Sequence, residues 1–236
     1  KALRQHPRFN PSLDLNAMAT FLRFGFIPSP HSIYKNTYKL EPGCLLTIRP
    51  QQLPQIDRYW DLRSIALRNT REPWSFNDED TLNQFECLLG DAVTQRMIAD
   101  VPLGAFLSGG IDSSTIVALM QKNSDQPVRT FTIGFQEIET NESVYAKKIA
   151  THLGTNHQEF IVEPQHIFQL LPTLADWYDE PFADISQIPT LLVSQMTRQN
   201  VTVALSGDGG DELFAGYKRY FKLSQRLGQM EKVPPA

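Results

Sequence analysis

The chain has 236 residues, of which 41% are hydrophobic and 20% are charged, and its net charge is −4 at pH 7. This composition supports a sizeable core and excludes an intrinsically disordered chain, while the acidic balance disfavours a nucleic-acid-binding protein, whose binding face must be basic. No apolar run reaches the roughly 18 residues of a transmembrane helix and no leader is recognisable, so no membrane partner is expected.

Two cysteines, Cys44 and Cys87, are present. They cannot form a disulfide framework, so a reduced, cytoplasmic setting is expected, and both are expected to be buried. Because the first residue is Lys1 rather than Met, the sequence is expected to be a piece of a longer protein.

The first 60 residues predict a small β-containing unit. Apolar residues recur at helical spacing over 15–26, and Gly25 suits the end of a helix. An extended stretch is expected around 32–38 and a strand over 44–48, after a turn that contains proline and glycine. The apolar content of this region is too small for a domain that stands alone.

A polar segment over 63–77 is expected to be an irregular linker. The charge changes on either side of it, because residues 1–60 carry 8 Lys and Arg against 3 Asp and Glu, whereas residues 61–236 carry 14 against 23. A shift of this kind is typical of two structural units.

Helices and strands alternate from residue 78 onward. In chain order we expect a helix from Asp78 to Met97, a strand over 101–107, a helix over 113–122, a strand over 128–135, a helix over 142–153, a strand over 159–162, helical stretches over 166–178 and 190–199, and a strand over 201–205. This alternation predicts parallel βαβ units and therefore an open α/β sheet with helices on both faces. Ligands of such sheets bind beyond the carboxyl ends of the strands.

A serine- and glycine-rich loop, residues 107–114, follows the first of these strands and opens a helix. Gly109 and Gly110 permit a tight turn and a close backbone approach, and three serines add hydroxyl groups. The N-terminus of the following helix favours an anion. The loop matches neither the Walker A pattern nor the dinucleotide fingerprint. A plain strand-to-helix turn is the alternative, but the whole octet favours a phosphate cradle.

An acidic loop, residues 206–214, follows the last predicted strand. Asp208, Asp211 and Glu212 lie within five positions, interleaved with glycines. Clustered carboxylates repel one another unless a cation compensates them, and Mg²⁺ on a polyphosphate would do so. Asp112 and Asp211 are therefore candidate metal ligands. A solvated acidic turn is the alternative.

The motif Ser108-Gly109-Gly110-Ile111-Asp112-Ser113 resembles the pyrophosphate-binding loop of the ATP pyrophosphatases. The second loop, continued to Tyr217, narrows the resemblance to the synthetase domain of glutamine-hydrolysing asparagine synthetases, and residues 150–157 and 179–184 are similar to that family too. The motifs occur in the family's order over residues 78–221. The resemblance implies an open parallel α/β sheet of the adenine-nucleotide α-hydrolase (PP-loop) type, preceded by a small β-containing remnant.

The same resemblance implies a division into domains and a reaction. Residues 1–62 resemble the C-terminal tail of a glutaminase (amidotransferase) domain, 63–77 would be a linker, and 78–236 would be the N-terminal part of the synthetase domain. The implied reaction activates aspartate with ATP as β-aspartyl-AMP, which releases pyrophosphate. Ammonia, derived from glutamine in the intact enzyme, then displaces AMP and gives asparagine. ATP and Mg²⁺ are the implied cofactors.

The resemblance also assigns roles to individual residues. The pyrophosphate would be held by Ser108, Gly109, Gly110, Ser113 and Ser114. The rest of the nucleotide would be bound by Leu107, Ile133, Ser206, Gly207 and Tyr217. Mg²⁺ would be held by Asp112 and Asp211, and the catalytic residues would be Asp208 and Glu212. Asp208 stands where many family members carry Glu, and it would steer or deprotonate the amine.

Two family features are not found in these residues. The glutaminase nucleophile, an N-terminal Cys, does not begin the chain, and the family's downstream lysine would lie beyond residue 236. We therefore expect no glutamine hydrolysis by these residues and weak ATP binding or slow turnover. Two alternative functions stay open. One is a relative that activates another carboxylate, such as a β-lactam synthetase, and the other is a non-catalytic nucleotide-binding fragment. The expected partners are small molecules (ATP, aspartate, ammonia or glutamine), and a homodimer stays open.

Overall fold

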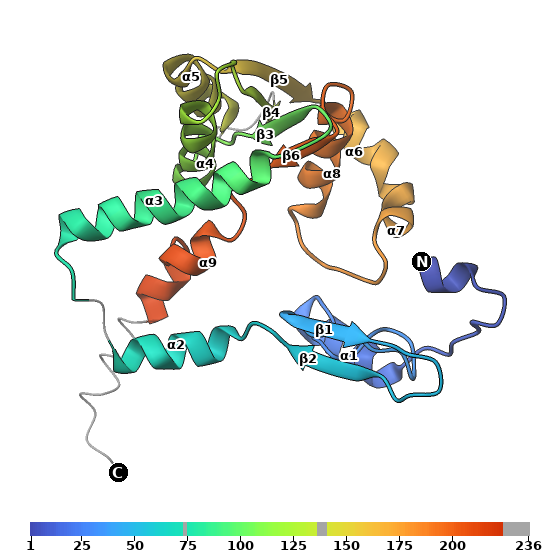
Figure 1. Ribbon diagram of the computed structural model, residues 1–236. Coiled ribbons are helices and arrows are strands. Elements are labelled where there is room, and N and C mark those ends of the chain that lie inside the picture. Colours follow the sequence, from blue (N-terminus) through green and yellow to red (C-terminus); the bar gives the residue numbers. More distant parts are fainter. Residues whose placement is uncertain (73–74, 136–140, 224–236) are drawn as a thin grey trace, which may run out of the picture. The chain divides into compact units, whose positions relative to one another are not determined.

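The computed structural model describes residues 1–72, 75–135 and 141–223 (Figure 1). The chain divides into two compact units. The first unit comprises Lys1–Thr81 with Ile167–Ile188, and the second comprises Leu82–His166 with the chain from Pro189 onward. Residues 167–188 therefore join the amino-terminal residues rather than their neighbours along the chain.

Short helices and one hairpin make up the first unit. Its elements are η1 (Ala2–Gln5), α1 (Leu15–Phe24), β1 (Cys44–Thr47), β2 (Gln55–Arg58), α2 (Leu62–Arg71), η2 (Leu171–Thr173) and α7 (Leu174–Trp177). Helix α1 confirms the predicted helix. The Asp14 carboxylate accepts hydrogen bonds from the backbone N–H of Asn16 and Ala17, at 2.9 and 3.2 Å, and Gly25 ends the helix with a φ of +79°.

The hairpin was predicted only in part. Strand β1 confirms the expected strand, and it pairs antiparallel with β2, which places Cys44 opposite Arg58. Strand β2 was missed because all four of its residues are exposed and show no apolar alternation. The extended stretch around 32–38 forms isolated bridges, Leu13 with Tyr34 and His31 with Tyr38, rather than a strand.

The expected irregular structure over 63–77 is wrong for most of its length. Residues Leu62–Arg71 form helix α2, whose start is capped by Asp61, because the Asp61 carboxylate accepts a hydrogen bond from the Ser64 backbone N–H at 3.2 Å. The hydrogen bond from the Ser64 hydroxyl is the main reason that the pKa of Asp61 lies below its usual range. Residues 73 and 74 lie outside the described part, and the role of the segment as a domain linker stays a prediction.

A parallel sheet is the centre of the second unit. Its strands, in the spatial order β5-β4-β3-β6, are all parallel. The strands are β3 (Leu103–Phe106), β4 (Arg129–Phe135), β5 (Asn156–Val162) and β6 (Val203–Leu205). The helices that belong wholly or partly to this unit are α3 (Asp78–Met97), α4 (Ile111–Lys122), α5 (Ser143–Leu153), α6 (Pro164–Leu170), α8 (Gln187–Thr197) and α9 (Gly210–Phe214). The predicted helix over 166–178 is interrupted at η2, which contains Pro172, a residue that has no N–H to continue an α-helix.

Helices cover both faces of this sheet, as the sequence predicts. Ala105 and Leu107 belong to a buried core with side chains from α3, α4 and α5. Phe106 alternates with them and lines a cavity with Thr190 and Val193 of α8, so α8 lies on the opposite face. In the described part of the chain, no helix is long and apolar enough to cross a membrane.

The order of the strands creates a crevice between β3 and β6. The chain passes from β3 through α4 to β4 and through α5 to β5, and it later adds β6 on the other side of β3. In parallel sheets, ligands bind at the carboxyl ends of the strands where the strand order reverses in this way. The serine- and glycine-rich loop follows β3, and the acidic loop follows β6.

Candidate active site

The two loops lie directly against each other at the carboxyl edge of the sheet. Strands β3 and β6 pair with Ala105 opposite Leu205, so they end at the same level. A Cβ on Gly207 would lie 2.6 Å from the Ser113 backbone nitrogen and 2.9 Å from the Asp112 carbonyl carbon. Only glycine permits this approach, which seats the second loop on the first turn of α4.

In the serine- and glycine-rich loop, called the serine loop below, two hydroxyl groups stabilise the backbone conformation. The Ser108 and Ser113 hydroxyls are 2.9 Å apart, and the backbone N–H groups of Ser108 and Gly110 donate to Ser113 Oγ and Ser108 Oγ, each at 3.2 Å. Gly109 adopts a φ of +82°, and a Cβ there would lie 2.6 Å from the backbone nitrogen of Ala146. The loop conformation is therefore fixed before any ligand binds.

An anion fits the start of helix α4. Gly110 precedes the helix and offers no side-chain cap. The first backbone bond runs from the Ser114 N–H to the Gly110 carbonyl oxygen at 3.1 Å, so the N–H groups of residues 111–113 have no partner within the helix. The Ser114 hydroxyl in that turn is buried and has no hydrogen-bond partner among the described residues. Unpaired donors at the positive end of the helix dipole suit a phosphate group.

The acidic loop lines a cavity of about 390 Å³ together with the serine loop. The cavity is lined by Phe106, Ser108, Asp112, Ser113, Thr190, Val193, Ser206, Gly207, Asp208, Gly209, Asp211, Glu212 and Tyr217. Four carboxylates face one cavity, and they would repel one another if no cation compensated them. The cavity lining therefore suits a ligand that brings positive charge with it.

A divalent cation fits this donor set when phosphate oxygens complete its coordination. Asp112 lies against the acidic loop, since a Cβ on Gly210 would meet its carboxylate oxygens at 2.7 and 2.8 Å. Asp211 supplies a carboxylate from the other loop to the same cavity. No three metal-ligating side chains converge within the described ranges, so these residues alone form no complete cage. Mg²⁺ commonly takes only one or two protein carboxylates beside substrate phosphates.

Glu212 is oriented by a tyrosine at the cavity wall. The Tyr217 hydroxyl donates to Glu212 Oε1 at 2.7 Å, and this hydrogen bond lowers the pKa of Glu212 and raises the pKa of Tyr217 to about 12. The Arg219 guanidinium lies 4.1 Å from the centre of the Tyr217 ring. Glu212 therefore faces the cavity as an ionised carboxylate at neutral pH.

Comparison with known proteins identifies the family. Residues 84–235 match the asparagine synthase family model, and residues 1–60 match a glutamine amidotransferase domain model. The chain belongs to the asparagine synthase family. It is 38% identical over 226 residues to the putative asparagine synthetase (glutamine-hydrolyzing) 2 of Methanocaldococcus jannaschii, covering 94% of this chain and 42% of that protein.

Two further comparisons bear on the extent of the match. Asparagine synthetase (glutamine-hydrolyzing) 1 of Bacillus subtilis is 33% identical over 222 residues, covering 94% of this chain and 34% of that protein. The chain thus spans less than half the length of these curated relatives. A structure of NMN synthetase from Francisella tularensis aligns with a TM-score of 0.40 and 17% identity, over 61% of this chain and 59% of that chain, which is too low to carry a conclusion.

Most of the site residues expected from the asparagine synthase resemblance lie at the cavity. The ones that line it are Ser108, Asp112, Ser113, Ser206, Gly207, Asp208, Asp211, Glu212 and Tyr217. Gly109, Gly110 and Ser114 belong to the same turn but are not in the lining. The Leu107 side chain is 1% exposed and lies in the core, and Ile133 on β4 is half-buried outside the lining. The roles of all these residues stay predictions.

Four lining residues are not among the site residues expected from the sequence: Phe106, Thr190, Val193 and Gly209, the last of which lies within the acidic loop. Phe106 could have been found, because alternation along β3 places it on the face opposite Ala105 and Leu107. Thr190 and Val193 lie on the expected helix α8, but nothing in their spacing indicates that this part of the helix faces a ligand. Their position depends on the crossover of α8 to the other face of the sheet.

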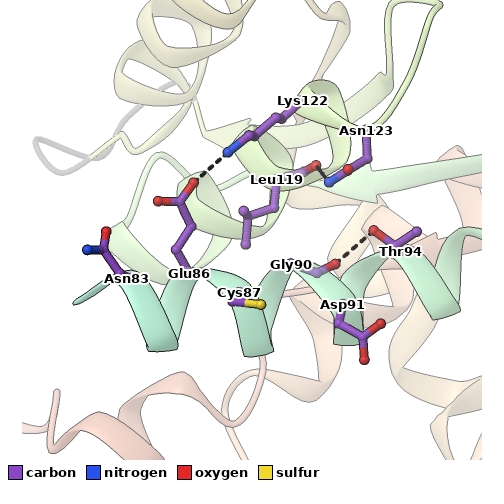
Figure 2. A pocket seen from close by; sticks show the side chains of 9 residues that line it. All are labelled: Asn83, Glu86, Cys87, Gly90, Asp91, Thr94, Leu119, Lys122 and Asn123. Atoms are coloured by element: carbon purple, nitrogen blue, oxygen red, sulfur yellow. Dashed lines mark hydrogen bonds and ion pairs between the residues drawn. The ribbon is translucent and has the colours of Figure 1, made fainter. Parts of the chain in front are cut away.

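A second pocket, of similar volume, lies between α3 and the last turns of α4 (Figure 2). Lys122 Nζ pairs with Glu86 Oε1 at 2.6 Å across it. Cys87 also lines this pocket and is exposed, which corrects the expectation of a buried cysteine, whereas Cys44 is half-buried. The pocket lies at the negative end of the α4 dipole and has no glycine-rich loop, so it does not suit a nucleotide phosphate.

Proposed function

We propose that the intact protein is an AMP-forming asparagine synthetase that uses ATP to convert aspartate to asparagine. One observation carries this proposal: the contact of Gly207 with the first turn of α4 brings the serine loop and the acidic loop of an asparagine synthase family member to one cavity. Hydroxyl groups and free N–H groups suit the phosphates, and carboxylates from both loops suit their metal ion.

The first step activates the side-chain carboxylate of aspartate. One carboxylate oxygen attacks the α-phosphorus of ATP, and the bond from that phosphorus to the pyrophosphate oxygen breaks. Ser108, Ser113 and the N-terminus of α4 stabilise the negative charge on the departing pyrophosphate. Asp112 and Asp211 would hold Mg²⁺, which supplies further neutralisation of the phosphate charge. The contribution of the protein is mainly positioning and charge compensation.

The second step forms the amide. Ammonia attacks the acyl carbon of β-aspartyl-AMP, the bond from that carbon to the AMP oxygen breaks, and the nitrogen loses a proton. Asp208 is our candidate for steering ammonia and accepting that proton, because it lines the cavity on the acidic loop. Its carboxylate is one methylene shorter than the Glu of many family members. Glu212, whose pKa the Tyr217 hydrogen bond lowers, would contact the polar groups of the substrate.

Glutamine is the proposed source of ammonia. Residues 1–60 match a glutamine amidotransferase domain, and the two curated relatives at 38% and 33% identity are named as glutamine-hydrolyzing. The reactive cysteine that such chemistry needs is not assigned to Cys44 or Cys87, which lie on a hairpin strand and on the wall of the α3–α4 pocket. The part of the protein described here is therefore assigned to the synthetase reaction.

The nucleotide product tests this proposal. The complete gene product is incubated with Mg-ATP, aspartate and ammonium chloride, and AMP is separated from ADP. We expect AMP and pyrophosphate in equal amounts, dependent on aspartate. ADP would contradict the proposal, and AMP formed with glutamate or another carboxylate but not with aspartate would assign the protein to a related amide- or β-lactam-forming synthetase. Absence of turnover with any carboxylate, although ATP binds, would support a non-catalytic nucleotide-binding role.

A further inference from the structure

Segments that match two different family models meet inside the first unit. Residues 1–60 match the amidotransferase domain, and residues 167–188 lie within the asparagine synthase match. Both nevertheless belong to one compact unit. Contacts between them therefore connect the two kinds of domain within the described structure.

A lysine from the amidotransferase-like region is the centre of these contacts. Lys39 Nζ donates to the Ile27 carbonyl oxygen at 2.5 Å and forms an ion pair with Glu180. The Lys39 and Glu180 side chains are 31% and 24% exposed, so both are largely removed from water. Removing one partner would leave the other charge partly desolvated and uncompensated.

A backbone contact beside the ion pair holds the same segment. The Ala183 N–H donates to the Gly25 carbonyl oxygen at 2.8 Å. A Cβ on Gly25 would lie 3.3 Å from the Ala183 carbonyl oxygen, so the two backbones are close. Residues 180–183 are therefore attached to the amino-terminal residues at two points, Lys39 and Gly25.

The attached segment leads directly into α8. The Ser186 N–H donates to Asp184 Oδ1 at 2.7 Å, and the Tyr178 hydroxyl donates to the Gln187 carbonyl oxygen at 3.4 Å. These bonds order the residues just before and at the start of α8. Farther along the same helix, Thr190 and Val193 line the site cavity. The conformation of residues 179–188 therefore bears on the start of a helix that contributes to the site.

The α8 wall is the part of the cavity that suits a carboxylate substrate. The serine loop is assigned to phosphates, and the acidic loop carries three carboxylates that repel another one. Thr190 and Val193 carry no charge, and Thr190 offers a hydroxyl donor. A substrate carboxylate would thus meet the least repulsion beside α8.

We propose that Lys39 and Glu180 are a positioning pair, through which the amidotransferase-like region holds residues 179–188 and thereby sets the affinity of the synthetase site for its carboxylate substrate. This inference rests on the proposed function for the identity of the substrate. The physical attachment of the segment does not depend on that identity, so the two can be tested separately.

Steady-state kinetics of the complete gene product, with ammonium as the nitrogen source and saturating Mg-ATP, give the first test. Lys39→Met and Glu180→Gln are each expected to raise the KM for aspartate about fivefold and to change kcat less than about twofold. Lys39→Arg keeps the charge and is expected to restore most of the affinity. Lys35→Met is the matched control, because Lys35 is an exposed lysine near Lys39 in the chain.

The double variant Lys39→Met with Glu180→Gln shows whether the two residues act together. We expect its KM to equal that of the single variants, since each single change already breaks the pair. Multiplied effects in the double variant would overturn the pairing. Unchanged KM values in both single variants would overturn the positioning role, even if the variants unfold at lower temperature.

Hydrogen exchange separates this proposal from the proposed function. Peptides covering residues 179–188 are expected to exchange about fivefold faster in Lys39→Met than in Lys35→Met, whatever substrate the enzyme uses. Equal exchange in the two variants would overturn the attachment itself. If the unmodified protein forms no AMP with aspartate, the proposed function is contradicted. Faster exchange in Lys39→Met would still establish the attachment in that case.

Discussion

The serine loop and the acidic loop use the same backbone geometry for different chemistry. Each follows a parallel strand, β3 or β6, at the same edge of the sheet, and each contains glycines that permit close approach. The Ser108 and Ser113 hydroxyls of the serine loop bond to each other and to its backbone, whereas the carboxylates of the acidic loop face the cavity. One loop is thus preorganised for an anion, and the other needs a cation.

This difference explains why neither loop is a site alone. The serine loop by itself is the start of a helix without a side-chain cap, and the acidic loop by itself is a cluster of like charges. Their contact at Gly207 and Gly210 places Asp112, on the first turn of α4, beside the acidic loop. The pair of loops therefore suits the metal-bound polyphosphate that we propose as its ligand, in which phosphate and cation compensate each other.

Separating the two loops should have the largest effect. Gly207→Ala would place a Cβ 2.6 Å from the Ser113 backbone nitrogen, and such overpacking against backbone costs about 1–3 kcal/mol. We expect the affinity for Mg-ATP, measured by calorimetry, to fall at least about tenfold. Gly90→Ala is the control, because its Cβ would meet only Leu119 Cδ2 at 3.9 Å. Equal affinities in the two variants would mean that the loops need not touch.

Removing a carboxylate from the acidic loop should affect the metal-dependent part of binding alone. Asp211→Asn is expected to lower the affinity for ATP at least about tenfold in Mg²⁺, with little change in EDTA, because a neutral amide is a weaker ligand than a carboxylate. Titration with and without Mg²⁺ measures this difference. Asp125→Asn, an exposed aspartate outside the cavity, should behave like the unmodified protein. The same loss in both media would remove Asp211 from the metal site.

Asp208 should distinguish the two half-reactions. Asp208→Asn is expected to leave aspartate-dependent exchange of pyrophosphate into ATP within about threefold and to slow asparagine formation about 100-fold, which is typical for loss of an acid–base group. Both rates are measured on the complete gene product. An equal decrease in the two rates would contradict a role on the ammonia side.

A smaller effect is expected at the tyrosine that orients Glu212. Tyr217→Phe removes the hydrogen bond that lowers the pKa of Glu212, so that pKa should rise toward its usual range. If ionised Glu212 is needed, the acid limb of the kcat/KM profile should move to higher pH. Tyr220→Phe is the control on the neighbouring ring, 5.6 Å away. An acid limb that stays in place would remove ionised Glu212 from the reaction.

The smallest effect is expected at His157 on the edge strand β5, where a substitution should change stability but not the two loops. His157 Nδ1 lies 2.9 Å from Thr130 Oγ1, its Nε2 is buried without a partner among the described residues, and burial lowers its pKa below 6.5. Because the unfolded state then binds the proton more tightly, the free energy of unfolding should fall as pH drops through about 6.5 toward the lowered folded pKa, and level off below it. His157→Gln should flatten this slope in thermal unfolding, and an unchanged slope would contradict the assignment.

The core of the second unit could be predicted because short apolar strand segments alternate along the chain with longer helical segments. Strand β4 and helix α4 occupy nearly the expected ranges, and Gly154 ends α5 in a left-handed conformation, as a helix-stopping glycine should. The short helix α9 was not predicted, since Gly210–Phe214 reads as an acidic loop and its hydrophobic anchor, Phe214, contacts Phe85 only in the folded chain. The alternation of strand and helix segments therefore identified the sheet but not the elements that depend on tertiary contacts.

The candidate site could be predicted as two loops but not as one cavity. The residue types in each loop indicated phosphate and metal chemistry, and parallel strands indicated a common edge. The contact of Gly207 with the first turn of α4, and the contribution of Thr190 and Val193, depend on strand order and on the crossover of α8. The attachment of residues 180–183 to Lys39 and Gly25 joins segments more than 140 positions apart, which no local pattern indicates.

The fate of the carboxylate oxygen tests the central claim most directly, that the two loops form one site for adenylation of a carboxylate. Aspartate labelled with ¹⁸O in its side-chain carboxylate is converted by the complete gene product in the presence of Mg-ATP and ammonium, and the nucleotide is analysed by mass spectrometry. Adenylation of the side-chain carboxylate predicts one ¹⁸O atom in AMP and none in pyrophosphate. Label in inorganic phosphate, with ADP as the nucleotide product, would contradict it.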